Sequence, residues 1–253
     1  MTSPFAISCV MPTTVSRWWT IPLAIECWRN QTYRDSELII VVDGPETLPN
    51  GDHISTLWAS DLRIRYHYLV GERTLGAKWN IAIKHAAYPW VALWADDDWH
   101  GPTRLERTMA AVEPGIGAVA DHTCLFHELH GERLTARYTY PWDDGDKIFR
   151  YVVSGTLAFD RKLGLDTPFP SIAKGSDDFF VYDLLKKTKT ALLAQPPYFY
   201  VAMCHGNNTS SYIPRLQGFP DDFDSEFKDF DGDIAEVMGG DLAKYEAAFA
   251  QTC

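Results

Sequence analysis

Apolar residues in the first 112 positions occur in two patterns, as short continuous runs and at helical spacing. Residues 5–12 (FAISCVMP) are mostly apolar up to a proline, and residues 37–45 (ELIIVVDGP) are a nearly continuous β-branched run that leads into an Asp-Gly turn. Such runs are typical of strands buried on both faces of a parallel sheet. Shorter runs predict strands at residues 63–69 and 90–95. Three segments between these runs have the apolar spacing of amphipathic helices: residues 17–30, 75–87 and 103–112.

This alternation of strands and helices predicts an α/β fold with a mostly parallel central sheet flanked by helices. Parallel strands end at one edge of a sheet, and ligands bind outside that edge. Asp43 ends one predicted strand, and Asp96, Asp97 and Asp98 follow another. We therefore expect these carboxylates to lie in one crevice.

The second half of the chain has a less regular pattern. It predicts strands at residues 116–120 and 198–203 and a helix at residues 177–187. Residues 151–159 (YVVSGTLAF) alternate but contain Ser-Gly-Thr, which suggests an edge strand or a bulged strand. Residues 221–241 are densely acidic, and a last helix is predicted at 240–251. We interpret this part of the chain as an acidic C-terminal extension.

Composition and charge narrow the classes of protein that fit. The chain has 253 residues, 46% of them hydrophobic, which suits one large core. A net charge of −11 disfavours binding to duplex nucleic acid, and five scattered cysteines argue against a zinc knuckle or a disulfide framework. There is no basic and apolar leader, and no apolar run reaches the roughly 18 to 20 residues of a membrane helix. We expect a soluble, cytoplasmic protein without an integral membrane segment.

Three adjacent aspartates, Asp96 to Asp98, follow the apolar run at residues 90–95. Carboxylates gathered at a buried strand end must be neutralised by protons, by a basic partner or by a metal ion. Hard oxygen ligands suit Mg²⁺ or Mn²⁺, which in turn bind phosphates. An acidic turn with only a structural role fits the same residues. The sequence alone leaves both interpretations open.

Several other motifs fail on spacing. His127-Glu128-Leu129-His130 is one residue short of the zinc motif His-Glu-x-x-His. The repeated aspartates at residues 229–233 resemble a calcium loop, but Ile234 and Gly240 stand where that loop needs glycine and glutamate. No Walker loop and no nucleophile elbow are present.

Seven short segments occur in a characteristic order along about residues 5–210: Pro12-Thr13-Thr14, Gln31-Thr32-Tyr33, Glu37 to Gly44, Gly76 to Asn80, Ala95 to Pro102, Gly175 to Asp178, and His205 to Thr209. Together they resemble glycosyltransferase family 2, whose members have the Rossmann-like GT-A fold. The chain departs from the family pattern at Ser176, which replaces a glutamate, and at Lys78, where arginine is common. Gly44 also follows Asp43 where many members have a second aspartate.

The resemblance implies a set of residues that bind a UDP-sugar donor: Pro12, Thr13, Thr14, Arg17, Asp43, Arg73, Lys78, Asp96 and Asp97. Within this set Asp43 would meet the uracil or ribose, and Asp96 would hold the ribose hydroxyls. Asp98, with Asp96 and with His205, would bind a divalent ion that bridges the diphosphate, either Mn²⁺ or Mg²⁺. An imidazole ligand favours Mn²⁺.

The resemblance also implies inverting transfer, in which one carboxylate takes the proton from the acceptor hydroxyl. Asp177 is the candidate base and Asp178 the alternative, although an aspartate at a helix start is also a common cap. Trp99 and Trp142 could stack on sugars or simply pack in the core. The implied activity is transfer of a hexose from a UDP-sugar to an acceptor hydroxyl.

The implied organisation is a GT-A domain at residues 1–215 and the acidic extension, with its terminal helix, at 216–253. Residues 1–112 would bind the nucleotide, and residues 113–215 would carry the acceptor and the base. Two other functions fit the acidic crevice, a nucleotidyltransferase and a non-catalytic module that binds nucleotide sugars or glycans. A glycan, a protein or a small molecule is favoured as the acceptor, a modified DNA base also fits, and the protein could form a homo-oligomer.

Overall fold

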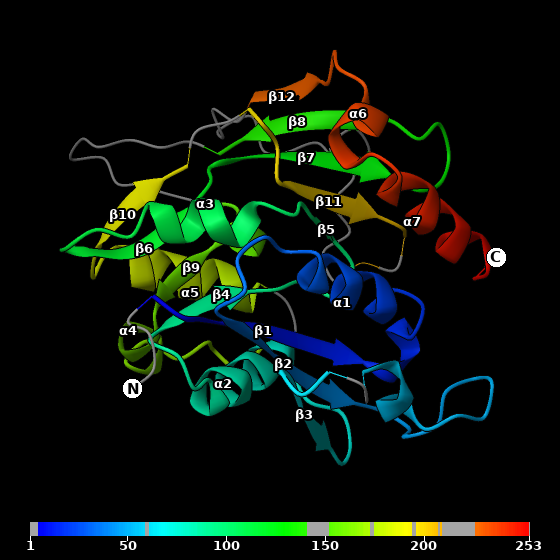
Figure 1. Cartoon of the computed structure of the whole chain (residues 1–253), viewed down its shortest axis with the longest axis horizontal. Coiled ribbons are helices and arrows are strands. Elements are labelled where there is room, and N and C mark those ends of the chain that lie inside the picture. The colour runs from blue at the N-terminus through cyan, green and yellow to red at the C-terminus, as the bar shows by residue number, and fades with distance from the viewer. Residues whose placement is uncertain are drawn as a thin grey trace.

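The computed structural model of the chain describes residues 5–58, 61–140, 152–172, 175–193, 196–206, 208 and 226–252. Within them the larger sheet has seven strands: β1 (Ile7–Thr14), β2 (Ser36–Asp43), β3 (Ile64–Leu69), β4 (Trp90–Leu93), β6 (Ile116–Ala120), β9 (Ala158–Asp160) and β10 (Lys189–Leu192). Their order is β10-β6-β9-β4-β1-β2-β3 (Figure 1). Only β9 runs antiparallel to its neighbours, which confirms the predicted mostly parallel sheet.

Helices cover both faces of this sheet. They are α1 (Ile21–Arg29), α2 (Leu75–His85), α3 (Arg104–Ala110), α4 (Arg161–Leu165) and α5 (Ser176–Leu185). Side chains of β1 alternate between the two faces: Cys9 and Met11 share a core with α1 and α3, whereas Val10 shares another with α2 and α5. The apolar pattern of the sequence is therefore consistent with burial on both faces.

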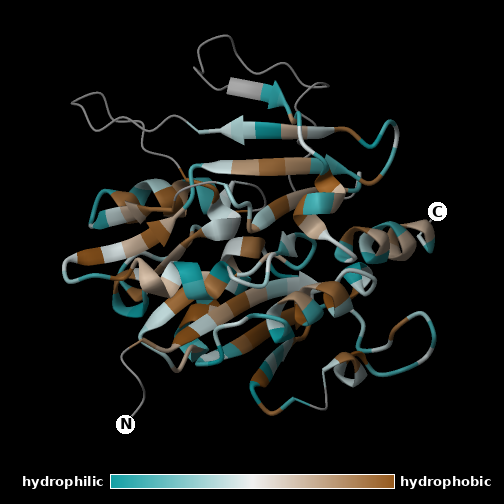
Figure 2. Ribbon diagram, turned by 45° about the horizontal axis from the view of Figure 1, so that its top comes forward, coloured by the Kyte–Doolittle hydropathy of each residue, from teal (hydrophilic) through white to brown (hydrophobic). Residues whose placement is uncertain are grey.

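The two central strands β1 and β2 are buried over almost their whole length. Figure 2 shows hydrophobic residues concentrated in the strands of this sheet and hydrophilic residues in the connecting loops. A short 3₁₀-helix, η2 (Ile54–Leu57), lies in the connection from β2 to β3. Because β1, β2 and β4 are parallel, their carboxyl ends meet at one edge.

A second sheet was not predicted from the sequence. It contains β5 (Trp99–His100), β7 (Thr123–Glu128), β8 (Thr135–Thr139), β11 (Tyr200–Cys204) and β12 (Glu226–Asp229), in the order β12-β8-β7-β11-β5. The acidic turn at residues 96–98 joins β4 of the first sheet to β5 of the second. Since β5 pairs antiparallel with β11, the turn lies where the two sheets meet.

Two predicted elements differ in the structure. The helix predicted from residue 17 begins at Ile21, after a 3₁₀-helix η1 (Val15–Arg17), because Pro22 suits a first helical turn. The strand predicted at 151–159 is instead a 3₁₀-helix, η3 (Ser154–Thr156), followed by the short strand β9. Tyr151 lies outside the described residues.

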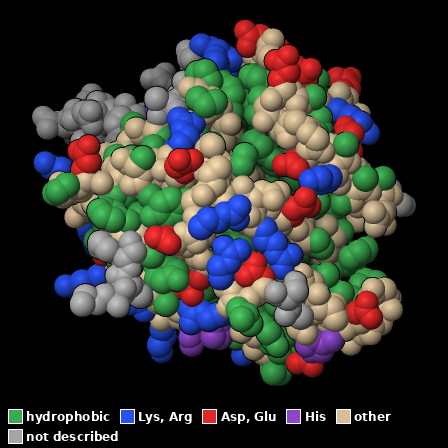
Figure 3. All heavy atoms as spheres, viewed as in Figure 1, with side chains coloured by type: hydrophobic (Ala, Val, Ile, Leu, Met, Phe, Trp, Pro, Cys, Tyr) green, Lys and Arg blue, Asp and Glu red, His purple; other side chains and the backbone are tan. Residues whose placement is uncertain are grey.

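The described part of the C-terminal segment comprises β12, α6 (Ile234–Met238) and α7 (Asp241–Ala250). Met238 and Tyr245 are buried in the same core cluster as β1 and α1. Acidic side chains gather over the loop between β12 and α6 (Figure 3). Among the described residues, no helix combines the length and the apolarity that crossing a membrane requires.

Gly76 in the first turn of α2 lies against the loop before α5. A Cβ atom there would overlap the Pro170 carbonyl oxygen and lie 3.2 Å from the Ser176 Cβ. We expect Gly76→Ala to lower the free energy of unfolding by about 1–3 kcal/mol. The clash is with a main-chain atom of Pro170, which cannot move aside as easily as the end of a side chain. Urea unfolding would measure it. Gly240→Ala is the control, since nothing lies within 4 Å of its Cβ position. Equal stability of the two variants would contradict this interpretation.

Candidate active site

The predicted site residues of β1 and β4 are in direct contact at the sheet edge. Thr13 is buried at the end of β1, and its Oγ1 donates a hydrogen bond to Asp96 Oδ2 at 2.5 Å. Pro12 lies buried within β1 beside Val41. Thr14 Oγ1 donates to the Asp43 carbonyl oxygen at 3.2 Å. Side chains at the end of β1 therefore bind both the acidic turn and the main chain at the end of β2.

Arg17 in η1 is the cation nearest to the acidic turn among the described ion pairs. Its Nη1 donates to Asp96 Oδ1 at 2.8 Å and to Asp97 Oδ2 at 2.6 Å. The negative charge of Asp96, followed by that of Asp97, raises the pKa of Arg17 above its usual value despite burial. Arg17 is thus a permanent positive charge between two carboxylates.

Asp97 also contacts the end of β11. Its Oδ2 lies 3.2 Å from Nε2 of the buried His205 and 3.3 Å from Asn208 Nδ2. The Trp19 and His205 rings pack in a T-shaped arrangement, with ring centroids 5.1 Å apart. Burial by itself would raise the pKa of Asp97, but Arg17 and His205 together lower it below the usual value. Asp97 is therefore held as a carboxylate.

Asp98 points in a different direction from Asp96 and Asp97. Its Oδ2 accepts a short hydrogen bond from the Tyr200 hydroxyl, and its Oδ1 accepts from the Met203 amide at 3.0 Å. Burial, and then the charge of Asp97, raises the pKa of Asp98 to about 8. The structure therefore brings His205 to Asp97 and turns Asp98 toward the second sheet.

Asp43 ends β2, and each of its two carboxylate oxygens accepts one hydrogen bond. Its Oδ1 lies 3.0 Å from Nζ of the buried Lys78, which also donates to the Thr13 carbonyl oxygen at 2.8 Å. Its Oδ2 accepts from the Arg73 amide at 2.8 Å. The Arg73 side chain is instead exposed and donates to the Glu72 carbonyl oxygen. Lys78 thus carries its charge into the site, and Arg73 contributes its main chain.

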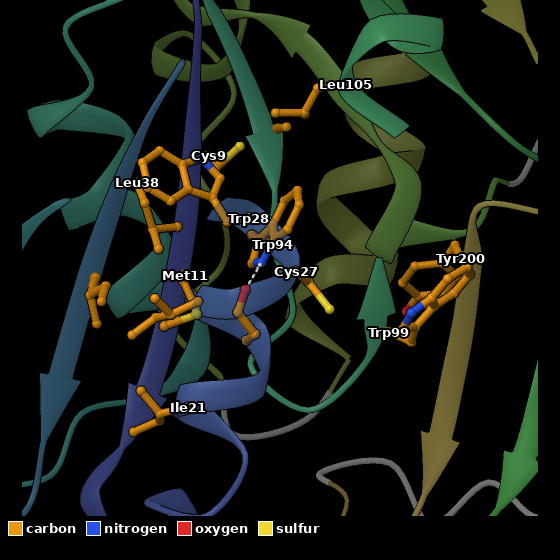
Figure 4. Packing of buried hydrophobic residues seen from close by; sticks show 14 of the residues in the cluster. Cys9, Met11, Ile21, Cys27, Trp28, Leu38, Trp94, Trp99, Leu105 and Tyr200 are labelled. Carbon is orange, nitrogen blue, oxygen red and sulfur yellow. Dashed lines mark hydrogen bonds between the residues drawn. The ribbon is translucent and has the colours of Figure 1, made fainter. Parts of the chain in front are cut away.

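Arg104 of α3 forms hydrogen bonds that hold the backbone just before the acidic turn. The fully buried Arg104 donates to the Leu93 carbonyl oxygen at 2.6 Å and to His100 Nδ1 at 2.5 Å. His100 Nε2 then donates to the Ala95 carbonyl oxygen at 3.1 Å. Burial, and then Arg104, holds the pKa of His100 well below its usual value, so this imidazole is neutral. The indole of Trp94 donates to α1 (Figure 4).

Helix α7 supports the other side of the turn. The buried Tyr245 hydroxyl donates to the Asp98 carbonyl oxygen at 2.8 Å. The Trp99 indole donates to Asp241 Oδ2 at 3.0 Å, and its ring is buried. Figure 4 shows Trp99 beside Tyr200, so Trp99 packs in the core instead of facing a ligand. Trp142, the other candidate for stacking, lies outside the described residues.

The two candidate bases differ in environment. Asp177 is half-buried at the start of α5, and its Oδ2 accepts from Ser154 Oγ at 3.0 Å. Asp178 is exposed. A Cβ atom on the next residue of η3, Gly155, would overlap the Tyr200 hydroxyl, which bonds to Asp98. Neighbouring residues of η3 therefore lie next to Asp177, through Ser154, and next to Tyr200, the partner of Asp98.

Several site residues were missed in the sequence. Ser154 belongs to the Ser-Gly-Thr sequence within residues 151–159. That sequence indicated an irregular backbone but gave no reason to assign Ser154 a function. Asn208 is part of the His-Gly-Asn-Asn-Thr segment and could have been chosen with His205. Tyr200 and Tyr245 have no local signal, because a tyrosine in a strand or a helix looks like an ordinary core residue.

Comparison with protein families gives one match, to the family described as Glycosyl transferase family 2, over residues 8–162. This match spans more than half of the 253 residues of the chain. It contains all of β1 except Ile7, the strands β2 and β4, and the acidic turn. A search of curated protein sequences gives no match.

Solved structures of low sequence identity share the fold. S. aureus TarS 1–349 in complex with UDP has a TM-score of 0.55 and 17% identity, over 78% of this chain and 60% of that one. TarS 1–349 with UDP-GlcNAc gives 0.54 and 17%, over 78% and 58%. The mannosyltransferase PcManGT from Pyrobaculum calidifontis, with GDP-Man and Mn²⁺, gives 0.54 and 16%, over 80% and 58%. This chain thus covers less than two thirds of each of these proteins.

Proposed function

The chain belongs to glycosyltransferase family 2 and has the GT-A fold, and we propose that it transfers a hexose from a UDP-sugar to an acceptor hydroxyl with inversion. The observation that carries this proposal is the convergence of β1, β2, β4 and β11 on the acidic turn. Thr13, Arg17 and His205 all contact Asp96 or Asp97 there. The carboxyl ends of parallel strands are where α/β sheets bind nucleotides.

The nucleotide would lie over β1 and β2. Asp43 would accept a hydrogen bond from the uracil or ribose, since each of its oxygens keeps a lone pair beyond those used by Lys78 and Arg73. Lys78 sets the direction of that carboxylate. Asp96, held by Thr13, would face the ribose hydroxyls. The pairing of a fixed carboxylate with a buried lysine supports recognition of a neutral, hydrogen-bonding base.

The donor groups present fit a divalent ion at Asp97 and His205. Two ligands about 2.1 Å from an octahedral ion, at right angles, stand about 3 Å apart. Asp97 Oδ2 and His205 Nε2 are 3.2 Å apart. In the described part of the chain, no three His, Cys, Asp or Glu side chains gather around one point. The protein would thus supply two ligands and leave others to phosphates and water, as is common for Mg²⁺ and Mn²⁺.

Such an ion, when bound, neutralises negative charge on the departing diphosphate. The chain itself would perform the proton transfer. Asp177 would take the proton of the acceptor hydroxyl while that oxygen bonds to the anomeric carbon and the bond from this carbon to the phosphate oxygen breaks. Ser154 Oγ, 3.0 Å from Asp177 Oδ2, orients the carboxylate. The half-buried position of Asp177 favours it over the exposed Asp178.

Calorimetric binding of UDP and GDP, each with and without Mn²⁺, tests the donor assignment. We expect UDP to bind only weakly without metal and at least about tenfold more tightly with it. If the site is shaped for uracil, as proposed, GDP should bind about tenfold or more weakly than UDP under the same conditions. If GDP binds more tightly than UDP, the donor is a GDP-sugar and the assignment to UDP is wrong. Failure of both nucleotides to bind with any divalent metal would reject the proposal.

A further inference from the structure

Arg17 contacts the oxygen that the proposed function assigns to the divalent ion. Its Nη1 is 2.6 Å from Asp97 Oδ2 and 2.8 Å from Asp96 Oδ1. The same Asp97 oxygen is approached by His205 Nε2 at 3.2 Å and by Asn208 Nδ2 at 3.3 Å. A carboxylate oxygen has about two lone-pair directions. A metal ion bound to this oxygen would therefore take the place that Arg17 uses.

The position of Arg17 reflects a need for positive charge. Asp96 and Asp97 are both buried, and buried carboxylates without a cation are strongly destabilising. Within the described residues, Arg17 is the one arginine or lysine that forms an ion pair with either of them. Its side chain is 17% exposed, so the pair is largely shielded from water. Two cations on one shielded oxygen would repel each other.

We propose that Arg17 is an exchangeable counter-ion, which occupies the acidic turn until metal and nucleotide enter together and then moves to the diphosphate. This inference rests on the proposed function. Arg17 follows Thr13 and Thr14 by only a few residues, in the segment expected to line the nucleotide. A guanidinium also matches phosphate oxygens well, through paired N–H donors. The diphosphate therefore offers Arg17 a new partner when the metal displaces it from Asp97.

The exchange couples metal binding to nucleotide binding. Metal alone must displace Arg17 without offering it a new partner, so it binds weakly. When metal and a diphosphate bind together, Arg17 forms a new ion pair with the diphosphate. Each ligand therefore increases the affinity for the other by the same factor. An Arg17 that merely holds η1 against the turn would act differently, because its removal would loosen the site and weaken both ligands.

The test is a titration of Mn²⁺ alone, followed by electron paramagnetic resonance, and a calorimetric titration of UDP in saturating Mn²⁺. Wild type, Arg17→Gln and Arg17→Lys would be compared. We expect Arg17→Gln to bind Mn²⁺ alone at least about tenfold more tightly and UDP about fivefold or more weakly. Arg17→Lys keeps the charge and should fall between the two. Arg34→Gln, a change of the same charge at an exposed arginine, should match wild type in both titrations.

The exchange predicts that Arg17→Gln strengthens binding of Mn²⁺ alone and weakens binding of UDP, whereas a purely structural role of Arg17 predicts that both weaken. If both Arg17 variants bind Mn²⁺ alone no more tightly than wild type, while wild type binds Mn²⁺ with UDP, the exchange is wrong and the donor site stands. If no protein binds Mn²⁺ even with UDP, the proposed metal and the exchange both fail. Thermal unfolding by circular dichroism identifies a variant that has not folded, and Arg17→Lys then provides the comparison with wild type.

Discussion

Asp97→Asn is expected to remove Mn²⁺-dependent binding of UDP and to lower kcat/KM for release of UDP from a UDP-sugar by about 10³-fold or more. The amide has nearly the shape of the carboxylate but no charge. It would leave His205 without the carboxylate 3.2 Å away and would remove one of the two proposed metal ligands. Calorimetry with UDP and Mn²⁺, and rates with UDP-glucose and UDP-N-acetylglucosamine, would measure the two effects.

Asp98→Asn is the matched control for this substitution. Burial raises the pKa of Asp98 to about 8, so its carboxyl group is mostly neutral at pH 7 and an amide is a close substitute. An asparagine can still bond to Tyr200 and accept from the Met203 amide. We expect UDP affinity to stay within about threefold of wild type. The reverse result, loss of binding in Asp98→Asn alone, would return the metal to Asp98, as the sequence motif suggested.

Asp177→Asn is expected to lower kcat by about 10³-fold while leaving the Kd for UDP within about twofold. The proposed role of Asp177 is confined to proton transfer, and its carboxylate accepts a hydrogen bond from Ser154, outside the acidic turn. The rate of UDP-sugar turnover, with water or an identified acceptor, would be measured beside the calorimetric Kd.

Asp178→Asn provides the comparison for the base. Asp178 is exposed and one residue from Asp177, so the two variants carry the same change of charge at the same helix terminus. We expect Asp178→Asn to keep kcat within about threefold of wild type. A loss of turnover in Asp178→Asn with full activity in Asp177→Asn would exchange the two roles.

Most of the first half of the fold was predictable. The continuous run at residues 37–45 corresponds to β2, and the helical spacing at 75–87 corresponds to α2. These elements have a strong local period, because they are buried on both faces or along one stripe. The second sheet was missed for two reasons. β5 and β12 are short and pair with strands distant in the sequence, and the hairpin strands β7 and β8 mix polar and apolar residues without a continuous apolar run.

The candidate site was predictable as a set of residues but not as a set of contacts. Thr13, Arg17, Asp96, Asp97 and His205 were all chosen from the sequence, and the structure brings them together. Their roles remain proposals. The sequence favoured Asp98 as the partner of His205, whereas in the structure His205 contacts Asp97. The side chains of three consecutive residues in a turn have no period from which their directions can be read.

The sequence by itself determined which strands end at the site. Parallel strands place their carboxyl ends at one edge, so Asp43 and the acidic turn were expected at the same edge as the end of β1. The strand order β4-β1-β2 then makes them neighbours. Only the tertiary structure decided which carboxylate faces a cation. Tyr200 and Met203 of β11 draw Asp98 away, Tyr245 of α7 holds its carbonyl oxygen, and Arg17 binds the other two aspartates. These partners lie far apart in the chain, and only the packing of the second sheet and α7 against the first brings them to the turn.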